Sequence, residues 1–99
     1  MEQGISGKQV NKVGKVLSDK SKVEILKFIN TKPAYGKEIA EALMLSTPTI
    51  SHHMNVLLEI GLVETTVESN KIYYSMNREA MSKVLDEIKG YLLDQNKEA

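Results

Sequence analysis

The segment from Ser46 to Glu64, STPTISHHMNVLLEIGLVE, decides the fold of this 99-residue chain. It opens with Ser46 or Thr47 as a helix cap, and Pro48 suits the first helical turn. Its apolar side chains recur at helical spacing: Ile50, Met54, Leu57 and Leu58. Gly61 then ends the helix, because glycine favours the left-handed conformation common after a helix. The segment therefore predicts one capped, amphipathic helix.

A second, shorter helix is predicted just before it. This helix runs from Gly36 or Lys37 to Leu43, and a tight turn follows at Met44 and Leu45. A short helix, a turn of a few residues and a capped helix make a helix–turn–helix.

The periodicity changes directly after Gly61. Residues 62–68 and 71–76 are rich in β-branched and aromatic residues, and Ser69-Asn70 between them favours a turn. This pattern predicts a β-hairpin. A helix–turn–helix followed by a hairpin is the winged-helix layout.

The remaining sequence predicts three more helices. One spans about residues 8–17, a second begins after Ser18 or Asp19 and ends before Pro33, and the last runs from Arg78 to about Asp94. In the second, Ile29 or Phe28 completes the inward-facing stripe. The predicted fold is mainly α with a small β-hairpin, a winged helix-turn-helix in the order α-α-α-α-β-β-α. We expect tails at 1–7 and 95–99 around one domain at 8–94.

Composition narrows the class of protein. The chain is 41% hydrophobic and has no cysteine, which excludes disulfides and thiolate metal sites. No apolar run is long enough to cross a membrane, and no signal-peptide core is present. We expect a cytoplasmic protein. It has no glycine-rich phosphate loop or nucleophile motif, so we do not expect an enzyme.

Charge is unevenly distributed although the formal net charge is zero. Residues 8–37 carry eight lysines against two acids, whereas residues 38–99 carry five basic residues against ten acids. This asymmetry is compatible with a basic face for nucleic acid. Solvated helix faces rich in lysine would give the same count.

The exposed side of the 46–64 helix carries short or planar hydrogen-bonding side chains. A recognition helix presents such residues of its first turns to base edges, and asparagine pairs well with adenine. Lysines at helix starts and at the hairpin would contact phosphates. We therefore predict double-stranded DNA as the partner, contacted by Lys20, Lys22, Lys37, Ser46, Thr47, Thr49, Ser51, His52, Asn55 and Lys71.

The adjacent histidines do not suggest a metal site. Neighbouring helical residues point about 100° apart, whereas a helical metal pair needs a spacing of three or four. We predict neither a metal nor a cofactor, and we expect His53 to be a boundary residue bonded to a backbone group.

Several segments together resemble bacterial and archaeal ArsR-type transcription regulators. Residues 17–26, LSDKSKVEIL, are similar to their LSDPTRLRIL-type segment, and residues 38–43, EIAEAL, to their ELAEAL helix. Residues 46–57 resemble their S-x-x-T-V-S-H-H-L-x-x-L recognition helix. Gly-Leu-Val at 61–63 and KIYYSM at 71–76 extend the likeness to about residues 10–92.

The resemblance implies a homodimer that binds palindromic operator DNA and usually represses transcription. It also implies that the first and last helices form the dimer interface, and both carry apolar stripes. The interface residues would be Val10, Val13, Val16, Met81, Val84, Leu85, Ile88, Tyr91 and Leu92.

Some family features are missing. Metal-sensing members use cysteines, or Asp and His pairs on the last helix, where this chain has Arg78, Ala80, Tyr91 and Asp94. The sequence indicates no small-molecule effector. It also resembles the C-terminal DNA-binding domain of longer regulators. The neutral charge and an acidic hairpin leave one alternative, a winged-helix protein–protein module that does not bind DNA.

Overall fold

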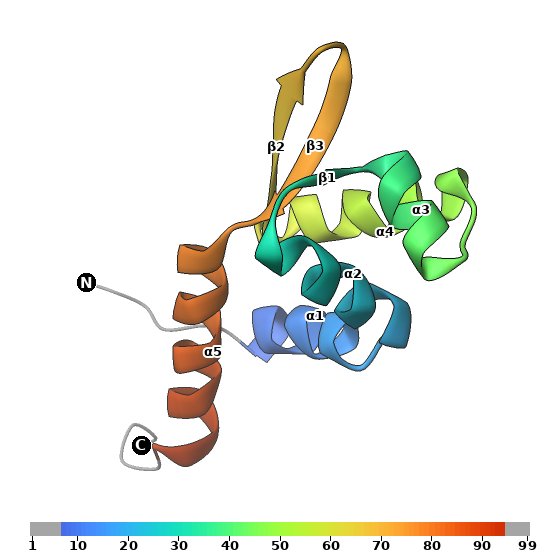
Figure 1. The fold of residues 1–99 in the computed structure, drawn as a ribbon. Helices are drawn as coiled ribbons and strands as arrows, with labels where there is room; N and C mark the ends of the chain where they lie inside the picture. The colour runs from blue at the N-terminus through green and yellow to red at the C-terminus, as the bar shows by residue number, and fades with distance from the viewer. Residues whose placement is uncertain (1–6, 95–99) are drawn as a thin grey trace.

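The computed structural model describes residues 7–94 and confirms a winged helix-turn-helix (Figure 1). The elements in chain order are α1 (Gly7–Leu17), α2 (Lys20–Thr31), β1 (Ala34–Tyr35), α3 (Gly36–Leu43), α4 (Thr47–Glu59), β2 (Val63–Glu68), β3 (Lys71–Met76) and α5 (Arg78–Leu93). The expected tails at 1–6 and 95–99 lie outside the described residues, and Gly7 belongs to α1.

Side-chain caps set the starts of α2 and α4, and Asn77 caps α5 in the same way. The Asp19 carboxylate accepts the backbone N–H of Ser21 at 3.0 Å, so Asp19 rather than Ser18 caps α2. The Ser46 hydroxyl accepts the backbone N–H of Thr49 at 3.2 Å and caps α4. Each cap satisfies an amide that has no partner within its own helix.

The helices of the helix–turn–helix, α3 and α4, end in the same way. After α3, the N–H groups of Met44 and Leu45 donate to carbonyls three and five residues back, at 3.3 and 2.9 Å. After α4, Gly61 and Leu62 do the same at 3.0 and 3.1 Å. This pair of bonds needs a left-handed residue at its first position. Met44 has φ 60° and Gly61 has φ 80°, so the ending predicted at Gly61 is confirmed.

The predicted hairpin is present as β2 and β3. Its register runs from Val63 opposite Met76 to Glu68 opposite Lys71. Ser69 and Asn70 connect the strands with φ of 53° and 63°. Two consecutive residues with positive φ make the tight turn that matches the twist of paired strands. The hairpin projects from the body as the wing (Figure 1).

The sheet has a third strand that the predicted order lacks. β1 pairs antiparallel with β3, with Ala34 opposite Tyr74 and Tyr35 opposite Tyr73, giving the order β1-β3-β2. Two residues after Pro33 are too few to show a periodicity in the sequence. Their extended conformation is stabilised by pairing with a strand almost forty positions later. β1 therefore ties the base of the wing to the start of α3.

Side chains from α1, α2, α3 and α4 pack with the base of the wing in one hydrophobic core. Its least exposed large side chains are Ile25, Ile29, Ile39, Ile50, Met54, Leu57 and Leu62. Of the two candidates for the inward position in α2, Ile29 is 1% exposed and Phe28 is 37% exposed. The alternative with Ile29 inside is the observed one.

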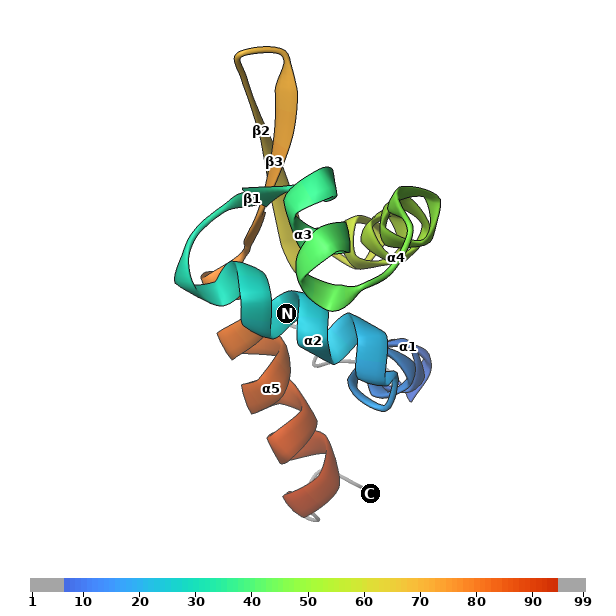
Figure 2. The same cartoon turned by 45° about the vertical axis from the view of Figure 1, so that its right-hand side comes forward.

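α5 lies apart from this core. None of its residues is buried, and only Met81 and Val84 pack against the core from this helix. Its first residue, Arg78, donates to the side-chain oxygen of Asn30 at the end of α2. Figures 1 and 2 show α5 extending away from the other helices, which gives a molecule of 51 × 24 × 20 Å. Within residues 7–94, no helix combines the length and apolar character needed to span a membrane.

Candidate nucleic-acid interface

The first turns of α4 present most of the predicted base-contacting residues to solvent. The exposed members are Ser46, Thr47, Ser51, His52 and Asn55. Thr49 is partly buried. The buried members of α4 (Ile50, Met54 and Leu57) hold the opposite side of the helix against the core. The helix therefore offers a continuous polar face, fixed in orientation by its apolar one.

Two hydroxyls on this face are already used within the protein. Ser46 donates to the Thr49 hydroxyl oxygen at 2.9 Å and also accepts the Thr49 backbone N–H. This exchange stabilises the start of α4. The side chains that remain free to meet base edges are Thr47, Ser51, His52 and Asn55.

The four predicted phosphate-binding lysines lie in different environments. Lys20 at the start of α2 and Lys37 at the start of α3 are exposed. The Lys71 ammonium lies 4.4 Å from the centre of the Tyr35 ring, a cation–π contact between the start of β3 and β1. Lys22 is different, because its side chain is 12% exposed and has two partners. Lys20 and Lys37 are thus the freest of the four.

Lys22 links the start of α2 to α4. Its ammonium donates to the Asp19 carboxylate at 2.9 Å and to Nδ1 of His53 at 3.1 Å. His53 therefore lies at the boundary, as predicted, but its partner is a side chain from another helix rather than a backbone group. We call Asp19, Lys22 and His53 the α2–α4 clasp.

Hydrogen bonding, burial and charge within the clasp shift two pKa values. The hydrogen bond from Lys22 lowers the pKa of Asp19 below its usual value. Burial lowers the pKa of His53, and the nearby Lys22 ammonium lowers it further, while the Asp19 carboxylate opposes the shift. The neutral imidazole is the form that accepts the hydrogen bond from Lys22.

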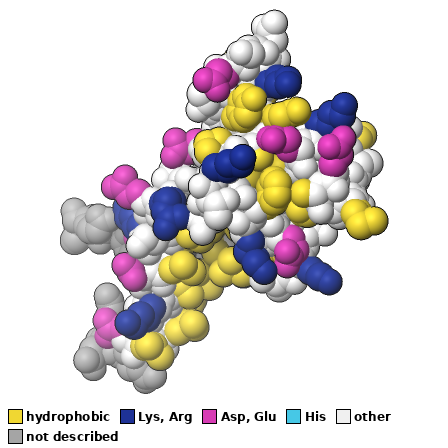
Figure 3. Space-filling view, viewed as in Figure 1, with side chains coloured by type: hydrophobic (Ala, Val, Ile, Leu, Met, Phe, Trp, Pro, Cys, Tyr) yellow, Lys and Arg dark blue, Asp and Glu magenta, His cyan; other side chains and the backbone are white. Residues whose placement is uncertain are grey.

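The wing offers little positive charge. Its strands expose Glu64 and Glu68, and the tip carries the exposed apolar pair Val67 and Ile72, at 71% and 50%. Figure 3 shows acidic, basic and apolar side chains mixed over this end of the molecule. Phosphate contacts by the wing would therefore be few.

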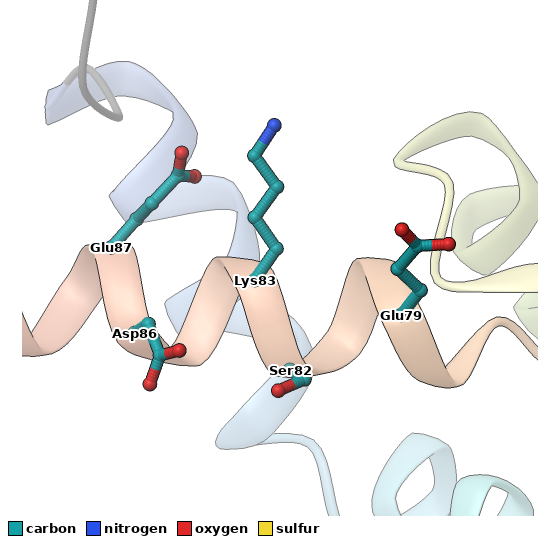
Figure 4. A pocket seen from close by; sticks show the side chains of 5 residues that line it. All are labelled: Glu79, Ser82, Lys83, Asp86 and Glu87. Carbon is teal, nitrogen blue, oxygen red and sulfur yellow. The ribbon is translucent and has the colours of Figure 1, made fainter.

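Two places bring possible metal ligands close together. The rings of His52 and His53 lie 6.1 Å apart at 51°, and His53 already accepts from Lys22. Along α5 a hollow of about 510 Å³ is lined by Glu79, Lys83 and Glu87 together with Ser82 and Asp86, all from that one helix. Figure 4 shows Lys83 standing between Glu79 and Glu87. Among residues 7–94, no group of three or more His, Cys, Asp or Glu could hold a metal ion.

The predicted interface residues divide between core and surface. Val13 and Val16 are 4% and 2% exposed within one chain, so they have little surface left for a partner. Leu85, Tyr91 and Leu92 are 45%, 53% and 63% exposed. The others, Val10, Met81, Val84 and Ile88, are partly buried. Figure 3 shows apolar side chains gathered over α5 at the lower left.

Two features of this region were not predicted from the sequence. The i, i+3 spacing of Asp19 and Lys22 was a detectable signal for their ion pair. The partnership of Lys22 with His53, thirty-one positions later, has no local signal. Tyr35 was also missed. It pairs with β3, its ring contacts Tyr73 edge-on at 5.5 Å, and its N–H donates to Glu38 at 3.0 Å.

The chain is similar in sequence to known bacterial regulatory proteins. A family model described as bacterial regulatory protein, arsR family, matches residues 19–65. The arsenical resistance operon repressor of Staphylococcus aureus is 31% identical over 84 residues, covering 85% of this chain and 81% of the relative. The transcriptional repressor SdpR of Bacillus subtilis is 34% identical, covering 69% and 76%.

Solved structures share the fold. An ArsR-like transcriptional regulator from Rhodococcus sp. RHA1 matches with a TM-score of 0.78 and 24% identity, over 90% of this chain and 84% of that one. The solution structure of a homodimeric winged helix-turn-helix DNA-binding domain from Mycobacterium bovis matches with a TM-score of 0.68 and 24% identity, over 99% and 98%.

Proposed function

The chain belongs to the ArsR family of bacterial regulatory proteins. From this premise we propose that it is a homodimer that binds palindromic operator DNA and represses transcription. Membership makes it a DNA-binding transcriptional regulator rather than an enzyme. The observation that carries the finer proposal is the polar face of α4. Thr47, Ser51, His52 and Asn55 are exposed together on the second helix of a helix–turn–helix.

Two observations support the dimer. α5 has no buried residue yet exposes Leu85, Tyr91 and Leu92, and a monomeric protein rarely leaves such a cluster uncovered. A protein of the same fold from Mycobacterium bovis is described as a homodimeric domain. A two-fold dimer places two recognition helices about one DNA turn apart, which calls for a palindromic site.

Repression is proposed from the relatives. Those from Staphylococcus aureus and Bacillus subtilis are both named repressors. We do not extend the arsenical part of the Staphylococcus aureus relative's name to this chain. Thiolates are the ligands that soft metals and metalloids prefer, and the sequence contains no cysteine.

The test is selection of binding sites from a random pool of duplex DNA at several salt concentrations. We expect the chain to enrich a palindrome with half-sites about 10 base pairs apart. His52→Ala/Asn55→Ala should weaken binding to that palindrome at least about tenfold, because each base contact contributes about 1–3 kcal/mol. The double variant should keep the helical circular dichroism of the parent.

The matched control is Ser82→Ala/Lys83→Ala, which changes two exposed residues on the polar side of α5 (Figure 4). It should bind the palindrome as the parent does. Failure to enrich any palindrome at about 50 mM salt, where phosphate contacts are strongest, would overturn the operator proposal. A protein-binding role for the polar face of α4 would then replace it.

A further inference from the structure

A cavity of about 320 Å³ lies where α1, the start of α2 and the C-terminal half of α4 meet. Its apolar lining comes from Val16, Val56 and Ile60. We call it the α1–α4 pocket. Its volume falls within the range of small-molecule sites, which are mostly apolar with a few polar groups that orient the ligand. Val56 lies in the last turns of α4 and Ile60 directly follows the helix, beyond the residues of the first turns that are proposed to face bases.

The charged lining of this pocket is predominantly basic. Lys12 and Lys15 of α1, three residues apart and both exposed, contribute two ammonium groups. Lys22 adds a third, already engaged by Asp19 and His53. Glu59 and Asp19 are the acidic members, so the lining has a net charge of +1. Within residues 7–94, neither Lys12 nor Lys15 forms a salt bridge.

An apolar lining with two exposed ammonium groups suits one class of ligand. We propose that the α1–α4 pocket binds a small organic monocarboxylate, with its apolar body on Val16, Val56 and Ile60 and its carboxylate at Lys12 and Lys15. A net charge of +1 is balanced by a monoanion. A phosphate dianion lacks the apolar body that the lining accommodates and exceeds the net charge of the lining by one unit. A neutral apolar molecule would gain nothing from the two ammonium groups.

The position of the pocket gives the ligand a regulatory role, an inference that rests on the proposed function. The pocket joins α1, a helix that the family resemblance assigns to the dimer interface, to α4, the proposed DNA-reading helix. It also borders Lys22, whose contact with His53 fixes α4 against α2. A ligand held between α1 and α4 binds one relative position of these helices better than another. It therefore shifts the spacing of the two recognition helices in a dimer and so the affinity for the operator.

The first experiment measures binding without DNA. The ¹⁵N-labelled full chain is titrated with two probes, 4-phenylbutyrate and octanoate, and with the neutral alcohol 4-phenylbutanol. We expect saturable shifts of backbone amides around Lys12, Lys15 and Val56, with the alcohol binding at least about fivefold more weakly. Lys12→Gln/Lys15→Gln should weaken the carboxylates by a similar factor.

A charge-matched control uses Lys27→Gln/Lys83→Gln, which removes two lysines that do not line the pocket. Its binding of the probes should equal that of the parent. Shifts that do not saturate, shifts centred elsewhere, or equal binding of acid and alcohol would overturn the carboxylate site.

The second experiment measures operator affinity with and without saturating 4-phenylbutyrate. A change of at least about threefold, absent in Lys12→Gln/Lys15→Gln, supports the regulatory role. Unchanged affinity with the pocket occupied overturns that role while leaving the binding site in place. Probe binding by a chain that selects no operator overturns the proposed function and not the pocket. The two failures are therefore distinguishable.

Discussion

Lys22 is the residue that most directly connects the start of α2 with α4, the proposed DNA-reading helix. Its ammonium has a carboxylate partner in Asp19 and an imidazole partner in His53, and its side chain is 12% exposed. Protonation of His53 would remove the acceptor and place a second positive charge beside the first. The clasp is therefore complete only while His53 is neutral.

This gives a pH dependence with a definite sign. The pKa of His53 in the folded chain lies below the ordinary value of 6.5, so the unfolded chain takes up a proton first as the pH falls. The stabilisation of the fold by neutral His53 is complete above about pH 6.5 and is lost progressively as the pH falls below that value. Asp19, whose pKa is lowered from 3.8, loses its contribution only in a more acidic range. Of these two residues, only His53 should therefore change the free energy of unfolding that urea denaturation measures between pH 7.5 and pH 5.

His53→Gln is the variant that tests it. Glutamine can accept the hydrogen bond from Lys22 but does not titrate. The free energy of unfolding should therefore fall less between pH 7 and pH 5.5 than in the parent. His52→Gln removes an exposed histidine but keeps His53 and its contact with Lys22, so its free energy of unfolding should still fall more over this range than that of His53→Gln. Equal slopes in the two variants would contradict the assignment.

At the residue scale, local roles were predictable and distant ones were not. The caps at Asp19 and Ser46 were among the alternatives that the sequence offered, since a cap bonds to amides two or three residues away. The contact of Lys22 with His53 depends on rotamers and on the packing of α2 against α4. A helical wheel places these side chains on a face but does not assign their partners.

At the scale of elements, the ends of α3 and α4 form a natural comparison. Both use the same pair of backbone bonds and a left-handed residue, but one has Met44 and the other Gly61. A Cβ at Gly61 would meet no atom within 4 Å, so only the backbone conformation opposes a side chain there. Met44 carries that conformational cost already, with a side chain that is 89% exposed.

Substitutions at these two positions should change stability in opposite directions. Gly61→Ala should lower the free energy of unfolding by about 1 kcal/mol, because left-handed backbone is costly for a residue with a Cβ. Met44→Gly should raise it by about 0.5–1 kcal/mol, since glycine adopts that conformation freely. Urea denaturation measures both values.

The control for Met44→Gly is Ala42→Gly, at an exposed position within α3. Glycine there should destabilise by about 1 kcal/mol, as in any right-handed helix. A loss of stability in Met44→Gly of the same size would show that the left-handed strain is not relieved.

The elements themselves were largely predictable from the sequence. The helices, the hairpin and its Ser69-Asn70 turn follow from periodicity, caps and turn residues. β1 could not be predicted, because a two-residue strand contains no alternation and exists only by pairing with Tyr73 and Tyr74.

At the scale of the whole molecule, α5 exposes several large apolar side chains. Leu92→Glu should weaken dimerisation at least about a hundredfold, because burying one leucine contributes about 1.5–3 kcal/mol and a two-fold interface contains it twice. Sedimentation equilibrium measures the change. The unfolding free energy of the monomer should stay close to that of the parent, since Leu92 is 63% exposed and outside the core.

Ser82→Glu is the matched control for charge and helix. It adds the same negative charge on the polar side of α5, where Ser82 borders the hollow shown in Figure 4. It should dimerise as the parent does. A parent that sediments as a monomer, or a Leu92→Glu variant that remains dimeric, would contradict the interface on α5.

The whole-molecule arrangement was the least predictable from the sequence. The apolar stripe of α1 was assigned to a dimer, yet Val13 and Val16 are buried within a single chain. Periodicity identifies which side of a helix is apolar, but not whether the same chain or a second copy covers it. That distinction depends on how α1 docks on α2, which is a tertiary outcome.

The join between the wing and α3 has a mechanical consequence. Tyr35 is at once a partner of β3, the residue before α3 and the ring beneath Lys71. A force on the hairpin is passed through Tyr35 to α3 and so to α4, the proposed DNA-reading helix. We therefore expect the wing and the helix–turn–helix to move as one stiff body, and the proposed dimer to deform at α1 and α5. A signal acting on this protein would register as a changed distance between two rigid bodies, with the shape of each preserved.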